Sequence, residues 1–306
     1  MLPFIFHPIY SQLTLPGRHR FPIEKYQGIQ SALIENGVPT DWFLQPDPVS
    51  KDILCRYFSP SYVDAFCDGV LDAKAMRRIG FPWSQQLVKR SLTAVGGTLL
   101  TAQQALHHNI AINLTGGYHH AFADLGAGFC IFNDLYLAAR QMIEEPGIER
   151  VLIIDCDVHQ GDGTALLAEN DTQIFTLSLH GEKNFPVRKQ VSNMDVPLQK
   201  GCQDEEYLDV LDTSLFYAFA QAQPDAVIYD AGVDVHEDDD LGHLSLTTEG
   251  VFKRDVMVLQ QCMTRQLPVM AVIGGGYQRD INALVSVHLQ LFRAAFSVFR
   301  GQDLTL

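Results

Sequence analysis

The sequence predicts an α/β fold in three layers, with helices on both faces of a mainly parallel central sheet. Short continuous apolar runs rich in β-branched residues alternate with longer segments of helical periodicity. Continuous apolar runs are typical of strands covered on both faces, as in parallel sheets. Nearly every run also ends in polar or glycine-rich residues. Because the carboxyl ends of parallel strands share one edge of a sheet, these polar ends indicate a ligand crevice there.

Five segments are predicted as strands because each is a continuous apolar run. In chain order they are Ile110–Leu114, Val151–Asp155, Gln173–Leu179, Ala226–Ala231 and Val269–Ile273. Their carboxyl ends carry the sequences TGGYHH, DCDVHQGDG, LHG, DAGVD and GGGY, respectively. We therefore expect five polar or glycine-rich segments to meet at the crevice.

Five longer segments are predicted as helices because their apolar residues recur with helical spacing. They are Gln86–His107, Phe132–Glu144, Asp204–Ala222, Thr247–Arg265 and Asp280–Phe299. The fourth begins with a threonine cap and an acidic first turn, which are helix-start signals. The chain has no internal repeat, low-complexity tract or linker-like change in composition. We therefore predict a single domain over residues 1–306.

The composition narrows the classes of protein to consider. With 306 residues, 47% of them hydrophobic, the chain can bury a large core. Its net charge of −14 argues against a nucleic-acid partner, since such binders are normally basic. Six scattered cysteines without a C-x-x-C pair indicate free thiols in a reducing compartment. The most apolar long stretch, Ile281–Phe299, is interrupted by His288, Gln290 and Arg293, so we expect a cytoplasmic protein that makes no membrane contact.

The segment VLIIDCDVHQGDGTA predicts a metal site. Asp155, Asp157 and His159 alternate along extended chain, so they share one side, where burial is costly unless a cation neutralises them. Carboxylate oxygen and imidazole nitrogen are suitable ligands for a divalent ion. Asp234, after another strand, could complete an Asp–His–Asp set with an open position, which is typical of catalytic zinc. The alternative is an exposed loop with helix-capping aspartates. Within the acidic run at 237–240, we expect Asp238 and Asp240 to belong to a solvated loop.

Two further segments predict catalytic groups. His119 and His120 follow a strand and a Gly-Gly turn, where paired histidines suggest proton transfer at neutral pH. Each imidazole needs a carboxylate to hold its tautomer, and Asp155 and Asp162 are available for this. Tyr277 follows three glycines and could donate its hydroxyl hydrogen to a developing oxyanion. A phosphate-binding glycine loop fits this last segment poorly, because no Lys or Ser/Thr follows in the required position.

Together these segments resemble the histone deacetylase family of zinc amidohydrolases, which has the arginase/deacetylase fold. The matching segments, in the family's order, are GGYHHAFADLGAGFCIFND, IDCDVHQGDGT, TLSLH, AGVDVHEDDDLG and GGGYQRD. They extend over roughly residues 18–292 and are highly specific in combination. The segments HRFPIEKY, HQGDG and AGVD…LGHLSLT…GVFKRD are most similar to the class IV branch and its bacterial relatives.

The resemblance implies a role for each matching residue. The expected zinc ligands are Asp157, His159 and Asp234, and the expected catalytic residues are His119, His120, Asp155, Asp162 and Tyr277. Within the second set, His120 would be the base and His119 an electrostatic partner. Substrate contacts are expected from Gly128, Phe129, Phe185 and Leu241. A structural potassium ion would be held by the carbonyls of Asp155, Asp157 and His159, with Ser178 and Leu179.

The resemblance also implies the activity. We expect one zinc ion, or ferrous iron, per chain, and removal of an acetyl or longer acyl group from lysine in a protein or peptide. Small acylated amines such as acetylpolyamines are the alternative substrates. Leu241 stands where the polyamine-selective branch has a glutamate, which argues against those substrates. Three other positions depart from the family pattern. Gln160 replaces a second histidine, and Asp240 replaces an arginine and makes the rim more acidic. The absence of Asp or Glu between Ala73 and Ile110 argues against strong peptide-sequence recognition.

Two other functions would use parts of the same sequence. Enzymes of the arginase group share the fold but hold two manganese ions with D-x-H-x-D patterns, whereas the order here is Asp155, Asp157, His159 and Asp162. Tyr277 and the tandem histidines would have no role in that chemistry. A non-enzymatic, metal-dependent interaction protein is the other alternative, although every expected catalytic residue is present.

Overall fold

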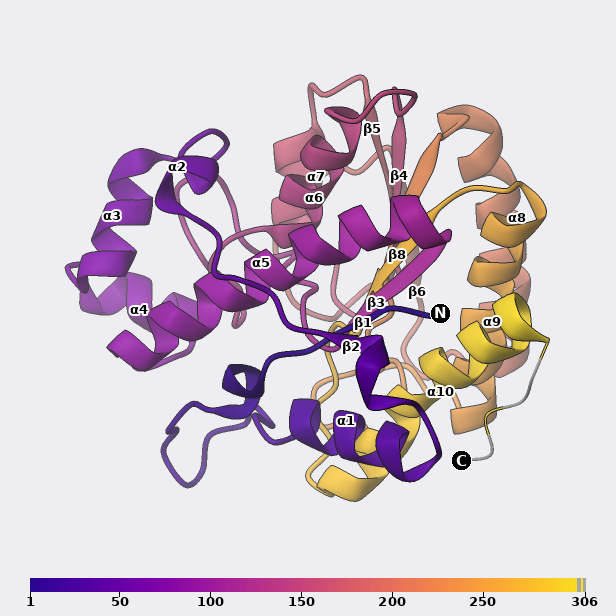
Figure 1. Ribbon diagram of the computed structural model, residues 1–306, viewed down its shortest axis with the longest axis horizontal. Coiled ribbons are helices and arrows are strands. Elements are labelled where there is room, and N and C mark those ends of the chain that lie inside the picture. The colour runs from indigo at the N-terminus through magenta and orange to yellow at the C-terminus, as the bar shows by residue number, and fades with distance from the viewer. Residues whose placement is uncertain (302–303, 305–306) are drawn as a thin grey trace.

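The computed structural model describes residues 1–301 and 304, and in this part of the chain eight strands form one sheet whose neighbouring strands are all parallel (Figure 1). The strands are β1 Phe4–Ile5, β2 Phe43–Leu44, β3 Ile110–Asn113, β4 Val151–Asp155, β5 Ile174–Gly181, β6 Met194–Leu198, β7 Ala226–Asp230 and β8 Val269–Val272. Their order across the sheet is β2-β1-β3-β8-β7-β4-β5-β6. The sheet is thus wholly parallel, where the sequence predicted a mainly parallel one.

Helices cover both faces of the sheet, as predicted. They are α1 Lys25–Glu35, α2 Lys51–Leu54, α3 Pro60–Asp68, α4 Ala73–Ile79, α5 Gln85–His108, α6 Asp134–Ile143, α7 Asp162–Ala168, α8 Asp204–Ala222, α9 Thr248–Thr264 and α10 Ile281–Arg300, with 3₁₀ turns η1 Pro8–Ser11 and η2 Thr40–Trp42. Helices α5, α6 and α7 pack on one side, and α8, α9, α10 and α1 form the other layer (Figure 1). The five predicted strands and five predicted helices all form, with ends that differ from the prediction by at most two residues.

The elements that the sequence did not predict have weak patterns. Strands β1 and β2 contain two residues each, too few for any alternation to show. Strand β6 has the sequence MDVPL and lies at the edge of the sheet. A proline cannot donate to a strand ladder and is tolerated at an edge, so Pro197 hides a real strand from pattern analysis.

The central strands place polar residues at one level of the sheet. Strand β4 has the sequence VLIID and is buried along its whole length. Its last residue, Asp155, pairs in register with Ser178 of β5 on one side and Asp230 of β7 on the other. The carboxyl ends of β4, β5 and β7 therefore meet at one edge.

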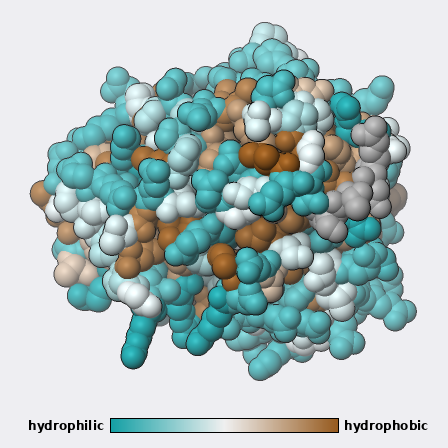
Figure 2. All heavy atoms as spheres, turned by 60° about the horizontal axis from the view of Figure 1, so that its bottom comes forward, coloured by the Kyte–Doolittle hydropathy of each residue, from teal (hydrophilic) through white to brown (hydrophobic). Residues whose placement is uncertain are grey.

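The surface is hydrophilic and the most apolar helix is buried, as expected for this layered core. With the lower side of Figure 1 turned forward, the surface is mostly hydrophilic, and hydrophobic residues are visible mainly in recesses (Figure 2). Among the described residues, only α10 has the length and hydropathy to cross a membrane, and 61% of its apolar window is buried in the fold. It packs chiefly against α9 and α1. A core helix has the same composition, so its apolarity is accounted for by packing.

Helix α5 approaches the N-terminal segments closely through two adjacent glycines. A methyl group at Gly96 would lie 2.0 Å from the main-chain oxygen of Asp47. One at Gly97 would lie 2.0 Å from the hydroxyl oxygen of Tyr10. Glycine in a helix interior costs about 1 kcal/mol relative to alanine. The close contact explains why glycine is used here despite that cost.

We therefore expect Gly96→Ala to destabilise the protein, although helix propensity alone predicts a gain of about 1 kcal/mol. The added methyl meets backbone, which cannot move aside, so we expect a loss of about 1–3 kcal/mol in the free energy of unfolding, measured by urea titration. Gly28→Ala in α1 is the matched control, because its methyl meets only a side-chain methyl of Val285, at 2.8 Å. Equal or higher stability of the Gly96 variant would contradict this account.

Candidate functional site

The polar ends of four parallel strands converge at the carboxyl edge of the sheet. The tandem histidines follow β3, the first two expected ligands follow β4, Asp234 follows β7, and Tyr277 follows β8. Strands β3, β8, β7 and β4 are consecutive neighbours in the sheet. The crevice predicted from the sequence therefore has its groups on adjacent loops.

Asp157, His159 and Asp234 come together as a buried group, which we call the metal centre. One ligand atom from each lies within 4.8 Å of the others. Nδ1 of His159 lies 2.9 Å from Oδ1 of Asp157 and 3.1 Å from Oδ2 of Asp234. The three residues are 2%, 9% and 0% exposed. Two carboxylates and an imidazole buried this deeply need a neutralising cation, and their atoms suit zinc.

Main-chain amides orient the two carboxylates of the metal centre. Asp157 Oδ2 accepts from the Gly275 amide at 2.8 Å, and Asp234 Oδ1 accepts from the Val158 amide at 2.9 Å. Among the described residues, no main-chain amide donates to the other oxygen of Asp234, which is buried and lies 3.1 Å from Nδ1 of His159. A buried, oriented carboxylate oxygen that faces another ligand atom is what a metal site requires, so the residues fit an ion.

The charges within the metal centre are strongly coupled. Burial, followed by the charge of Asp157, raises the pKa of Asp234 to about 7. Burial acts to lower the pKa of His159, but the carboxylates of Asp157 and Asp234 outweigh it and raise that pKa to about 10. Each group thus takes its protonation state from its neighbours, as expected where excess negative charge is confined in a dry site.

Each of the tandem histidines has a buried carboxylate behind it. Nδ1 of His119 lies 2.8 Å from Asp155 Oδ2, and Nδ1 of His120 lies 2.6 Å from Asp162 Oδ1. Burial works to lower the pKa of His119, but the charges of Asp155 and Asp157 raise it well above its usual value. Burial, and then the charge of His119, lower the pKa of His120 to about 4. At neutral pH, His119 is therefore cationic and His120 neutral.

Two residues that the sequence analysis missed hold the loop of Tyr277. The ammonium of Lys25 is buried and donates to the main-chain oxygens of Gly274 at 3.1 Å and Gly276 at 3.5 Å. Asp239 accepts from the Tyr277 amide at 2.7 Å. Burial, together with the charges of Asp157 and Asp234, raises the pKa of Tyr277 well above its usual value, so its hydroxyl stays protonated.

Asp238 and Asp240 were expected to belong to a solvated loop, and both are exposed, whereas Asp239 between them turns inward. Asp239 accepts from three main-chain amides, those of Tyr277, Leu241 and Gly242, and is partly buried. Asp240 is exposed and forms an ion pair with Arg279 at 2.6 Å, so its charge at the rim is offset.

Aromatic side chains flank the approach to the metal centre. The ring of Phe185 lies edge-on to that of His120, with centroids 4.8 Å apart. On the other side, Phe129 lies 5.9 Å from the ring of Tyr277. A small inner cavity of about 30 Å³ is lined by the tandem histidines, Gly128, Phe129, Asp157 and Tyr277, among others. A larger cavity of about 670 Å³ lies outside it, against Leu241 and the segment 15–24.

Gln160 and Ser178 lie beside the metal centre but bond elsewhere. The amide of Gln160 donates to the Gln190 carbonyl at 2.8 Å and to Asp195 at 2.7 Å, so it clamps the neighbouring loop. The hydroxyl of Ser178 lies 3.0 Å from Nδ1 of His180. These contacts are consistent with Gln160 not being a ligand, and they leave the potassium site a prediction.

Arg254 ties the two ligand-bearing loops together from behind, although its position in the sequence gives no sign of this role. It is 0% exposed and pairs with Asp255 at 2.9 Å. Its guanidinium donates to the main-chain oxygens of Cys156 at 3.3 Å, Ala231 at 3.2 Å and Gly232 at 2.5 Å. These oxygens directly precede Asp157 and lie two and three residues before Asp234. One planar cation thus fixes the separation of two ligands.

Comparison with known proteins indicates the same family as the sequence motifs do. The profile of the histone deacetylase domain matches residues 19–291. The chain is 46% identical to an uncharacterized protein of Picosynechococcus sp., over 97% of this chain and 99% of that protein. It is 29% identical to histone deacetylase 2 of Arabidopsis thaliana, over 88% and 72%. It is 35% identical to the acetoin utilization protein AcuC of Bacillus subtilis, over 60% and 51%.

We expect Arg254→Lys to weaken zinc binding. Lysine keeps the charge, but its single ammonium cannot bridge three carbonyls, so the two ligand loops lose their fixed spacing. Loss of such supporting contacts typically lowers metal affinity about 10- to 100-fold. The measurement is competition with a chromophoric chelator, and Arg265→Lys at the exposed end of α9 is the control. A less stable variant with unchanged zinc affinity would show that Arg254 is only structural.

Proposed function

Since the chain belongs to the histone deacetylase family and is a deacetylase, a hydrolase that acts on amides, we propose that it removes acyl groups from the side-chain amine of lysine in proteins or peptides. One observation carries this proposal. A buried Asp–His–Asp metal centre lies beside a neutral histidine and a protonated tyrosine. These are the groups that hydrolysis of an unactivated amide requires.

Each group has a distinct role in the proposed reaction. Zinc held by the metal centre would polarise the acyl carbonyl and acidify the attacking water. His120 is neutral, and its Nδ1 is held by Asp162, so its other ring nitrogen can accept the proton of that water. Tyr277 donates its hydroxyl hydrogen to the oxyanion. The cationic His119 adds positive charge and can supply a proton to the departing amine.

The size of the inner cavity favours an acetyl group. Its volume of about 30 Å³ is far below the roughly 300 Å³ at which pockets for larger ligands begin. The adjoining cavity of about 670 Å³ is larger, but Arg18, Arg20 and Arg279 line it. Charged guanidinium groups are poor neighbours for a long fatty chain. We therefore infer acetyl-lysine as the preferred substrate.

The proposal also covers the bound ions, the branch of the family, the cellular location and the class of substrate. We assign zinc to the metal centre, and potassium to the carbonyls near Asp155, Ser178 and Leu179. The segments HRFPIEKY and GVFKRD support placement in the class IV branch. Free cysteines and an acidic surface support a cytoplasmic location without nucleic-acid or membrane partners. Leu241 offers no charge for a polyamine, which supports lysine over small polyamine substrates.

The proposal is tested with a panel of substrates, on protein of known metal content. Protein stripped of metal is loaded with one equivalent of zinc and given lysine peptides and polyamines that carry acetyl, butyryl or long acyl groups. We expect acetyl-lysine peptides to be hydrolysed with the highest kcat/KM. Turnover of polyamines alone, or of long acyl groups alone, would contradict the proposal. Activity that requires two manganese ions would favour arginase-like chemistry.

We expect Tyr277→Phe to lose about 10²–10³ in kcat, because one donor to the oxyanion disappears. Zinc content should not change, since the hydroxyl is not a ligand. Metal analysis of both proteins, run beside the kinetics, separates these two effects. Full activity of a zinc-loaded Tyr277 variant would show that the oxyanion is stabilised by other groups.

The pKa of His120 predicts the acid side of the pH profile. The deprotonated form is the base, and its pKa in the folded protein is about 4, below the usual 6.5. Activity is therefore retained as pH falls through 6.5 and lost only as pH approaches the lower value. The measurement is kcat/KM against pH, with zinc content determined at each pH to detect loss of the ion. An acid limb at or above the ordinary histidine value, with zinc retained, would contradict the assignment.

A further inference from the structure

Asp230 is a fully buried carboxylate that none of the proposed steps uses. It is the last residue of β7, is 0% exposed, and neither of its oxygens has a hydrogen-bond partner among the described residues. The neighbouring buried carboxylates each accept at least one hydrogen bond. Leaving both oxygens of a buried carboxylate unpartnered is costly, so Asp230 needs a partner that the protein itself does not supply.

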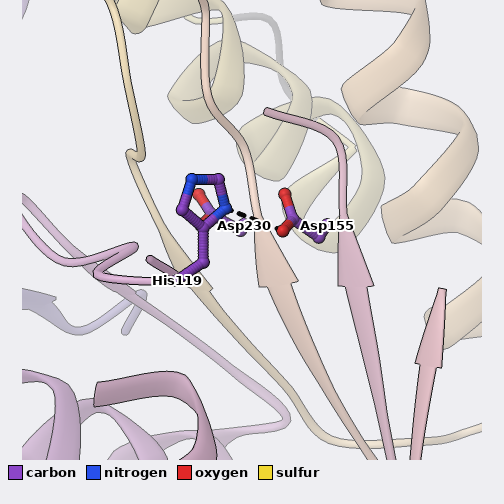
Figure 3. Close-up of side chains that lie close together, drawn as sticks. All are labelled: His119, Asp155 and Asp230. Atoms are coloured by element: carbon purple, nitrogen blue, oxygen red, sulfur yellow. Dashed lines mark hydrogen bonds and ion pairs between the residues drawn. The ribbon is translucent and has the colours of Figure 1, made fainter. Parts of the chain in front are cut away.

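The surroundings of Asp230 show what that partner can be. Asp155, at the end of the adjacent strand β4, and His119 lie close to it, and Figure 3 shows the three side chains converging. We call these three residues the Asp230 cluster. One ligand atom from each lies within 4.8 Å of the others, and all three residues are buried.

In the Asp230 cluster, the distance between His119 and Asp230 suits a shared ion better than a hydrogen bond. Nδ1 of His119 lies 3.9 Å from Oδ2 of Asp230, which is too far for a hydrogen bond. Two atoms that each lie about 2.1 Å from one ion are about 3.4 Å apart in a tetrahedron and at most about 4.2 Å apart. The separation of 3.9 Å falls within that range, and the 2.8 Å between His119 and Asp155 Oδ2 needs only a small adjustment.

We propose that the Asp230 cluster is a second cation site, which binds a divalent transition-metal ion next to the metal centre. An imidazole nitrogen with two carboxylates is a ligand set for zinc, manganese, iron or cobalt rather than for an alkali ion. The site is distinct from the expected potassium site. That site uses the Ser178 side of Asp155, whereas Asp230 lies on the opposite side, on β7.

The second ion would compete with an existing contact. Nδ1 of His119 can either donate its hydrogen to Asp155 or give its lone pair to an ion. Its other ring nitrogen, Nε2, lies 3.8 Å from Oδ1 of Asp157, so His119 stands between the two ion sites. Occupancy of the Asp230 cluster therefore removes the hydrogen bond that orients this histidine. Filling the second site should lower activity, whereas filling the metal centre should support it.

The experiment counts ions and does not depend on turnover. Metal-free protein, in a buffer with constant potassium, is titrated with Co²⁺ and followed by visible absorption, and bound metal is counted after desalting. We expect two equivalents in the wild type and one in Asp230→Asn, which keeps the size of the side chain but loses its charge. Asp171→Asn is the matched control, because Asp171 lies at the opposite end of the sheet beside Arg140. This variant should bind two equivalents of Co²⁺.

Activity provides the second measurement. For each protein, the rate with two equivalents of zinc is compared with its own rate at one equivalent. The second equivalent should lower the wild-type rate about tenfold or more. In the Asp230 variant it should change the rate by no more than about twofold. His119→Ala, which removes the nitrogen ligand, should also lose the second equivalent. One equivalent in the wild type, or two in Asp230→Asn, would overturn the proposal and leave Asp230 as a protonated acid. Absence of turnover in every protein would refute the proposed function and leave the ion count valid.

Discussion

The cost of burying negative charge at the end of a parallel sheet determines much of this structure. Four carboxylates lie at or just beyond the ends of β4 and β7, and each is 0–3% exposed. Such a concentration is tolerable only if cations, amides or bound ions surround it. Arg254 lies behind them, Lys25 lies behind the glycine loop, and His119 lies between the two clusters. The positions of the metal-binding and catalytic side chains follow from the cations that neutralise these carboxylates.

The sequence was sufficient to predict those parts of the molecule that depend on local pattern. Continuous apolar runs identified the five central strands, because burial on both faces leaves few polar positions in them. The alternation of Asp157 and His159 after such a run indicated a metal site for the same reason. The potassium site, the roles of the site residues and the single-domain organisation remain predictions, since neither the geometry nor the comparisons test them.

What the sequence did not reveal depends on contacts between distant segments. Lys25 lies at the start of an amphipathic helix, where lysine is normally solvated, and only the fold shows that its ammonium is buried under Gly274. Arg254 and Asp239 look like ordinary surface charges for the same reason. Asp230 ends an apolar run in the way Asp155 does, but its neighbours come from three separate parts of the chain. Charged residues that serve a buried site cannot be distinguished by composition from those that face water.

The ligands stand close to the rigid strands, whereas the opening is built from longer connections. Asp157 follows the end of β4 by two residues and Asp234 follows that of β7 by four, but the outer cavity is walled by residues 13–24, far away in the sequence. Chemistry and selectivity are therefore physically separable in this chain. Divergence or engineering can exchange the outer segments to admit new acylated molecules while the hydrolytic apparatus stays intact.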